Sequence, residues 1–222
     1  MAMAQTPGTA PDVRYHRSVA AGPYSQVETA FGGLTTVVPI IHLKGLGDTS
    51  IDVNLQHRSN LVANTVFATP NNSPGAGWNV DNLDAVNIGG NFDPAGHDSF
   101  IRQVAGDTIE WWDFNYSNGS YTSITPFNGV RENLALEYSG STVTGVVLTD
   151  EKTLTKTYYE NALGEVPPAV IFYRSRTVDV FGNTVTYTYN QDPQGNARPY
   201  QIIDASGRTV TFAYGSGAPY LL

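Results

Sequence analysis

The sequence predicts an all-β fold built from antiparallel hairpins. Three observations lead to this prediction: short runs rich in β-branched and aromatic residues follow one another, turn-forming residues separate them, and no convincing amphipathic helix is found. Several of the runs alternate apolar and polar residues, which is the pattern of a strand with one buried face. Towards the C-terminus we expect such hairpins to stack into one sheet or β-spiral.

Composition restricts the classes of function. The chain has 222 residues and is 41% hydrophobic, which is enough for a core, but only 14% are charged. Its net charge is −8 and its 12 basic residues are scattered, so nucleic acid and anionic membranes are not expected partners. Without cysteine it has no disulfides, thiolate zinc sites or cysteine nucleophile. It lacks 18 consecutive apolar residues, so membrane insertion is not expected.

The first 30 residues contain several prolines and little periodicity. We expect a leader over residues 1–30 that is largely extended or disordered and becomes ordered near Val27. Its start, MAMAQTP, lacks the basic and apolar regions of a complete signal peptide. Ala2-Met3-Ala4 has the small-x-small form that precedes a cleavage site, and we expect an expression start here in preference to a trimmed signal remnant. A β-rich pre-repeat domain is expected over 31–165 and a pair of repeats over 166–222, truncated at the C-terminus.

Two strands are predicted early in the pre-repeat domain. Leu34–Leu43 is β-branched and apolar, and Pro39 within it indicates a sheet edge or a bulge. Ser50–His57 alternates strictly and is therefore expected to be half-buried. Its apolar face consists of Ile51, Val53 and Leu55.

The middle of the chain alternates between predicted loops and strands. The segments Thr69–Val80 and Asn87–Ser99 are rich in turn formers and are predicted to be loops. Glu132–Tyr138 fits a short helical turn or a strand. Further strands are predicted at Asp107–Tyr116, Ser141–Thr149 and Ala169–Val180.

Near its end the chain repeats one pattern. DVFGNTVTYTY begins at Asp179, and DASGRTVTFAY begins 25 residues later at Asp204. In each copy Asp-x-x-Gly predicts a turn, with Gly182 and Gly207 tolerating a positive φ. The strand that follows has an aromatic face opposite a small, polar face. The aromatic faces consist of Val185, Tyr187, Tyr189, Val210, Phe212 and Tyr214.

This repetition predicts a structural role. One hairpin cannot bury an aromatic face alone, whereas neighbouring copies that pair edge to edge align their rings in one layer. Two copies are few for an array, so the chain is expected to be a fragment of a longer protein. The expected structural repeat residues are Asp179, Gly182, Tyr187, Tyr189, Asp204, Gly207, Phe212 and Tyr214.

The segment Asp179–Tyr214 resembles the RHS/YD repeats of large secreted bacterial proteins and of the teneurins. The segments GNTVTYTY and QIIDASGRTVTFAY, with their Gly-to-aromatic spacing, carry this resemblance. Upstream, GLGDTSIDVNLQHRSN and GAGWNV are similar to the pattern that precedes the repeats in bacterial members. The Tyr-Asp dipeptide of the family is missing, since Tyr189 precedes Asn190 and Tyr214 precedes Gly215.

The resemblance implies a large β-sheet spiral, closed in toxin-associated members into a hollow shell around a C-terminal cargo. This chain would form the N-terminal part of that wall in a secreted or cell-surface bacterial protein. Its main partner would be the rest of the same polypeptide. The resemblance implies no enzymatic activity for this part of the protein.

Residues with catalytic or binding chemistry give fewer indications. The four histidines form no metal-binding pattern, and we expect neither a metal nor a cofactor. Glu110 and Asp113 lie three apart in a predicted strand and thus on opposite faces, so one cleft could not use both. An alternative function is a carbohydrate-binding or adhesion module that recognises surface glycans through exposed aromatic residues. Its candidate sugar-binding residues are Trp111 and Trp112.

Overall fold

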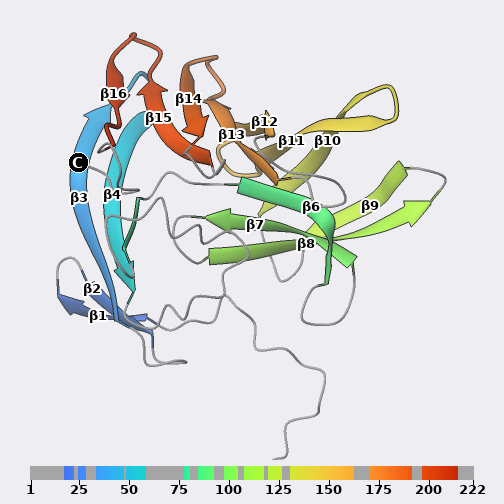
Figure 1. Ribbon diagram of the computed structural model, residues 1–222, viewed down its shortest axis with the longest axis horizontal. Coiled ribbons are helices and arrows are strands. Elements are labelled where there is room, and N and C mark those ends of the chain that lie inside the picture. The colour runs from blue at the N-terminus through green and yellow to red at the C-terminus, as the bar shows by residue number, and fades with distance from the viewer. Residues whose placement is uncertain are drawn as a thin grey trace, which may run out of the picture.

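The computed structural model confirms the all-β prediction: across the described residues the regular structure consists of antiparallel strands in two sheets, without a helix (Figure 1). The structure describes residues 18–22, 25–28, 34–47, 49–58, 78–80, 85–92, 98–104, 108–117, 120–126, 131–162, 171–191 and 197–214. Within these ranges, none of the elements is a helix long and apolar enough to cross a membrane.

The first sheet is formed by the N-terminal strands in chain order. Each strand pairs with the next, and β3 and β4 make up the longest hairpin of this sheet. The pairing register shifts between Pro39 and Ile41, so of the two predicted alternatives at this proline, a sheet edge or a bulge, the structure shows a bulge. The strands are β1 (Ser18–Gly22), β2 (Ser25–Glu28), β3 (Leu34–Lys44), β4 (Ser50–Arg58) and β5 (Trp78–Val80).

Regular strand structure begins earlier in the chain than the sequence predicts. Order was expected from about Val27, whereas β1 starts at Ser18 and pairs with β2, which pairs with β3. Each of the first two strands has only four or five residues, too few to show a clear alternation. The turn formers Gly22 and Pro23 therefore dominate the sequence signal of this segment.

The second sheet contains the remaining strands. Its main path runs β10-β11-β12-β13-β6-β7-β8-β9, and β9 also contacts β10, so the sheet curls back on itself (Figure 1). These strands are β6 (Ala85–Phe92), β7 (Asp98–Val104), β8 (Thr108–Ser117), β9 (Ser120–Pro126), β10 (Glu132–Ser139), β11 (Thr142–Asp150), β12 (Lys156–Ala162) and β13 (Ile171–Val178).

The sheet branches at β13. One edge of β13 pairs with β12, while the other pairs with β6 near Ile171 and with β14 near Val178. The branch consists of β14 (Thr184–Gln191), β15 (Ala197–Ile203) and β16 (Thr209–Thr211). The predicted boundary at residue 165 thus falls between β12 and β13, which pair within one sheet.

The loop predicted over Asn87–Ser99 is wrong at both ends. Asn87–Phe92 belongs to β6, and Asp98 and Ser99 begin β7. Ala85–Ile88 is buried on both faces, so this strand shows no alternation by which to recognise it. The Gly89-Gly90 pair, which suggests a turn, lies where the pairing between β6 and β7 shifts register.

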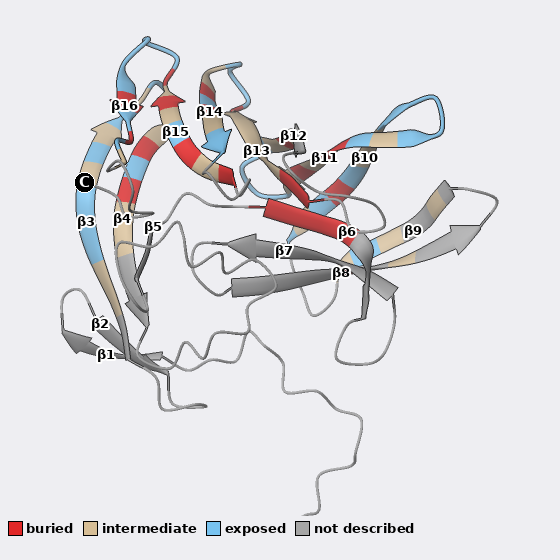
Figure 2. Cartoon of the chain, viewed as in Figure 1, coloured by how far each residue is buried: buried red, intermediate tan, exposed pale blue. Residues whose placement is uncertain are grey.

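Two hydrophobic clusters form the core. The first fills the curl of the second sheet, and the second joins the inner face of β4 to the branch strands (Figure 2). The buried members of the first cluster are Val86, Ile88, Trp112, Leu134, Val146, Leu148, Tyr159 and Phe172. Those of the second are Ile51, Val53, Val185, Tyr187, Ile202, Val210 and Phe212.

Candidate functional site in the repeated hairpins

The repeated sequence folds as two hairpins that pair edge to edge. The first hairpin is β13–β14 and the second is β15–β16, and β14 pairs with β15 from Thr186 to Gln191. Register shifts between Thr188 and Tyr189, which leaves Tyr200 of β15 as the additional residue. The four strands therefore form one continuous antiparallel surface.

The two hairpins bury their aromatic faces in one cluster. Val185 and Tyr187 of the first copy and Val210 and Phe212 of the second are buried there, at 1%, 8%, 8% and 6% exposure. Tyr189 and Tyr214 pack against the cluster from its border. On the opposite face, residues such as Thr186 and Thr211 are exposed. This is the alternation that the sequence predicts.

The Asp179 turn is held by its own carboxylate. Oδ1 accepts hydrogen bonds from the backbone N–H groups of Phe181 and Asn183, at 2.9 and 2.8 Å. Oδ2 accepts a 2.8 Å hydrogen bond from Nδ2 of Asn183. The backbone closes the turn, since Gly182 donates to the Asp179 carbonyl at 3.1 Å. The carboxylate is buried, and both of its oxygens accept hydrogen bonds from its own turn.

The Asp204 turn repeats this network. Oδ1 accepts from the backbone N–H groups of Ser206 and Arg208, both at 2.9 Å, and Gly207 donates to the Asp204 carbonyl at 2.9 Å. Oδ2 accepts from Nε of Arg208 at 2.6 Å. Desolvation alone would raise the pKa of Asp204, but hydrogen bonds from Arg208 and Ser206 outweigh it and hold that pKa below its ordinary value.

Gly182 and Gly207 are required by the positive φ of the backbone and not by a lack of space for a side chain. Gly182 has φ of 84° and Gly207 has φ of 80°, and a Cβ added at either position would meet nothing within 4 Å. These φ values lie in the region that other L-residues rarely adopt. The repeated glycine is thus explained by its conformational freedom alone.

Two tyrosine rings of the aromatic layer, one buried and one at its border, are covered by arginines. The Arg174 guanidinium lies 4.3 Å from the centre of the Tyr187 ring, and that of Arg198 lies 4.4 Å from the Tyr214 ring. Tyr214 also donates a 2.7 Å hydrogen bond to the Pro199 carbonyl. Burial raises the pKa of Tyr214 well above its usual range, although Arg198 opposes this effect.

A third turn, between β3 and β4, lies against the two repeat turns. Its sequence is GLGDT, and Gly45 donates a 2.8 Å hydrogen bond to the Thr49 carbonyl. Gly47 touches the Asp179 turn, and the carbonyl of Lys44 accepts a 2.5 Å hydrogen bond from Nη2 of Arg208. No pattern in the sequence indicates this contact, because its residues lie far apart along the chain.

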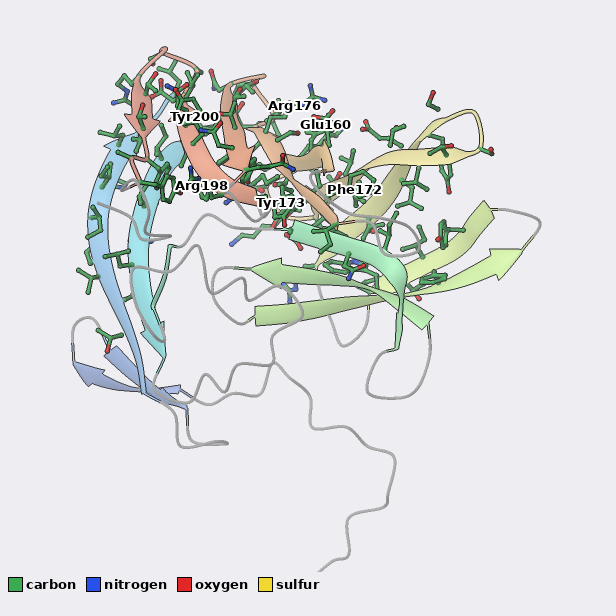
Figure 3. All side chains as sticks on the ribbon, in the orientation of Figure 1. Glu160, Phe172, Tyr173, Arg176, Arg198 and Tyr200 are labelled. Atoms are coloured by element: carbon green, nitrogen blue, oxygen red, sulfur yellow. The ribbon has the colours of Figure 1, made fainter. Side chains whose placement is uncertain are left out.

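A polar group on β12 and β13 joins the repeats to the strands before them. Arg176 donates a 2.9 Å hydrogen bond to Oε1 of Glu160 and stacks 4.0 Å from the centre of the Tyr158 ring. Ser175 donates to the other carboxylate oxygen of Glu160 (Figure 3 labels Arg176 and Glu160). Both oxygens of Glu160 are thus engaged, which suits a structural role.

Of the two candidate sugar-binding residues, the structure describes the side chain of Trp112 only. Trp112 is 0% exposed within the first cluster, so the prediction that it stacks on a sugar is wrong. In the alternation of β8 it shares a face with Phe114, and this face packs inside the curled sheet. The side chains of Trp111, Glu110 and Asp113 lie outside the described residues.

Metal-binding side chains are not gathered in the described part of the chain, where groups of three or more histidine, aspartate or glutamate residues are absent. His42 and Asp52 face each other across β3 and β4, and a 2.5 Å hydrogen bond joins Nδ1 of His42 to Oδ1 of Asp52. Ser50 donates a second hydrogen bond to the other carboxylate oxygen of Asp52. Burial would raise the pKa of Asp52, but these hydrogen bonds and the nearby His42 lower it. Ser50 bonds to the carboxylate and not to the histidine, so this is not a nucleophile–base arrangement.

The comparisons with known proteins give no family assignment. A scan of protein-family models and a search of curated proteins both find no match to this chain.

Proposed function

We propose that the chain is a non-enzymatic structural module. In this proposal it forms the N-terminal part of an RHS/YD-repeat scaffold in a secreted or cell-surface bacterial protein, where the complete β-shell encloses or delivers a toxin. The observation that supports it is the pairing of two hairpins with the same turn network, whose rings form one buried layer.

The chemistry of the repeated residues also supports a structural role. The Asp179 and Asp204 carboxylates are occupied by their own turns, and the rings that the repeat places at equal spacing are buried or partly buried. Catalysis needs groups that reach a substrate, whereas these groups reach other parts of the same chain. A carbohydrate-binding module is less well supported, because Trp112 is buried.

The reading frame that contains this chain provides the first test. A scaffold of this kind needs many copies, so we expect further Asp-x-x-Gly turns followed by aromatic strands beyond Leu222. A frame that continues without them would contradict the proposal.

A protease-protection experiment on the full-length protein tests the shell itself. The polypeptide that follows the repeats should resist protease in the native protein and become accessible when residues 171–214 are deleted. A control variant, Val180→Ala, alters an exposed side chain of the same region and should leave protection intact, because Val180 is 50% exposed. Equal cleavage in the native and deleted proteins would contradict enclosure, and a glycan array with strong, specific binding would favour the adhesion alternative.

A further inference from the structure

The β3–β4 hairpin covers the ring layer of the repeats. Ile51 and Val53 of β4 are buried in the same cluster as Tyr187 and Phe212, and Ile41, Leu43 and Leu55 pack around them. The hairpin therefore acts as a cap on the aromatic face of the two repeats. Hydrophobic contact of this kind is non-directional and does not by itself fix where a cap sits.

Shape fixes the cap at the first repeat turn. A Cβ added to Gly47 would overlap Oδ2 of Asp179 and would lie 2.8 Å from Nδ2 of Asn183 and 3.3 Å from Cδ2 of Phe181. The tip of the hairpin thus fits against this turn only because residue 47 has no side chain and residue 183 has a short one.

A hydrogen bond fixes the cap at the second repeat turn. Arg208 is anchored to the Asp204 carboxylate through Nε at 2.6 Å, and its Nη2 atom reaches the backbone carbonyl of Lys44 at 2.5 Å. The Asp204 side chain is only 1% exposed, so it holds the guanidinium in a fixed direction. This contact joins two residues that are 164 positions apart.

Asn183 and Arg208 occupy the same position in the two turns, four residues after the aspartate. Both donate a hydrogen bond to Oδ2 of that aspartate, at 2.8 and 2.6 Å. They differ in how far the side chain extends past the aspartate. Asn183 ends there and leaves room for Gly47, whereas Arg208 extends to Lys44.

We propose that this pair of side chains positions the β3–β4 hairpin as a cap over the repeats in a single register. Because Asn183 is short, its turn leaves room for Gly47. Because Arg208 is long, its turn supplies the hydrogen-bond donor to the Lys44 carbonyl. Exchanging the two residues would place a guanidinium where Gly47 lies and would leave Lys44 without its donor. The inference deepens the proposed scaffold role, but the contacts that carry it lie wholly within this chain.

Amide hydrogen exchange followed by mass spectrometry tests the proposal on the complete 222-residue chain. In Asn183→Arg we expect exchange in residues 41–55 to rise at least tenfold, while residues 134–148 of the first cluster keep their native rates. Asn183→Ala removes the same hydrogen bond to Asp179 without adding bulk, so it should raise exchange in residues 41–55 much less. Equal rates in the two variants would overturn the role assigned to size.

Substitutions at the second turn test the other half of the proposal without crowding. Arg208→Ala should raise exchange in residues 41–55 severalfold, and Arg208→Lys should recover part of the protection, because an ammonium can donate to the Lys44 carbonyl. Native exchange in Arg208→Ala would overturn the proposal, as would a uniform rise through both clusters. These rates do not depend on enclosure of a cargo, so failure of the cap and failure of the scaffold role are distinguishable.

Discussion

Gly47 and Gly140 have nearly the same backbone φ but very different surroundings. Their φ values are 60° and 63°, yet a Cβ would collide with the Asp179 turn at Gly47 and would meet nothing within 4 Å at Gly140. The two glycines therefore separate backbone strain from close approach between elements.

Alanine at these two positions should destabilise the protein to different degrees. Gly140→Ala introduces left-handed strain alone, and we expect a loss of about 1–2 kcal/mol in the free energy of unfolding. Gly47→Ala adds a collision at the cap, and we expect about 1–3 kcal/mol more. Urea unfolding of both variants measures this difference, and equal losses would show that the cap does not approach Asp179 closely.

The pH dependence of stability should reveal the Asp204 contact. Its folded pKa lies below the ordinary value near 3.8, so the ionised form is stabilised by folding. That contribution is complete above the ordinary pKa and disappears as pH falls through the lower, folded value. We expect Asp204→Asn to be less stable than the native protein at pH 7, with the difference closing below about pH 4. A difference that does not shrink as pH falls below about 4 would contradict this account.

The strands show which elements can be recognised from sequence. β4 and the repeat strands β14 and β16 alternate apolar and polar residues, so their buried faces could be predicted. β6 could not, because Ala85–Ile88 is buried on both faces and two glycines interrupt the remaining residues. Alternation is visible only where a strand has one buried and one exposed face.

The aromatic faces of the repeat hairpins should contribute much of the local stability. Phe212 is 6% exposed and Phe181 is 76% exposed, although both belong to the repeated segment. We expect Phe212→Ala to lower the free energy of unfolding by about 3–5 kcal/mol. Phe181→Ala should lower it by no more than about 1 kcal/mol, because most of its ring lies in solvent although one edge faces Gly47. Chemical denaturation of the two variants checks this, and similar losses would mean that Phe212 is not buried.

The arrangement of the whole molecule depends on contacts between residues far apart in sequence. The repeat pattern indicates that β13–β14 and β15–β16 pair edge to edge, because each copy has the same turn and ring spacing. It does not indicate what covers the ring layer. The cap depends on the shape of the Gly47 contact and on one hydrogen-bond donor at Arg208, and the sequence of the β3–β4 turn indicates neither contact.

The two hydrophobic clusters are connected through β13, which pairs with β12 on one side and with β6 and β14 on the other. We therefore expect the described strands to unfold together. Trp112 lies in the first cluster and contributes to tryptophan fluorescence, whereas Phe212 lies in the second cluster. The Phe212→Ala variant should therefore show a lower urea midpoint of unfolding when tryptophan fluorescence is measured. An unchanged midpoint would show that the clusters unfold independently.

Nuclear Overhauser measurements between methyl and ring protons test the central claim most directly. The claim is that the rings of two paired hairpins lie in one layer beneath the β3–β4 hairpin. Cross-peaks are expected from the methyl groups of Ile51 and Val53 to the rings of Tyr187 and Phe212, because all four side chains are buried in one cluster. If the cross-peaks expected within each hairpin appear but none connects β4 to the repeat rings, the account is contradicted.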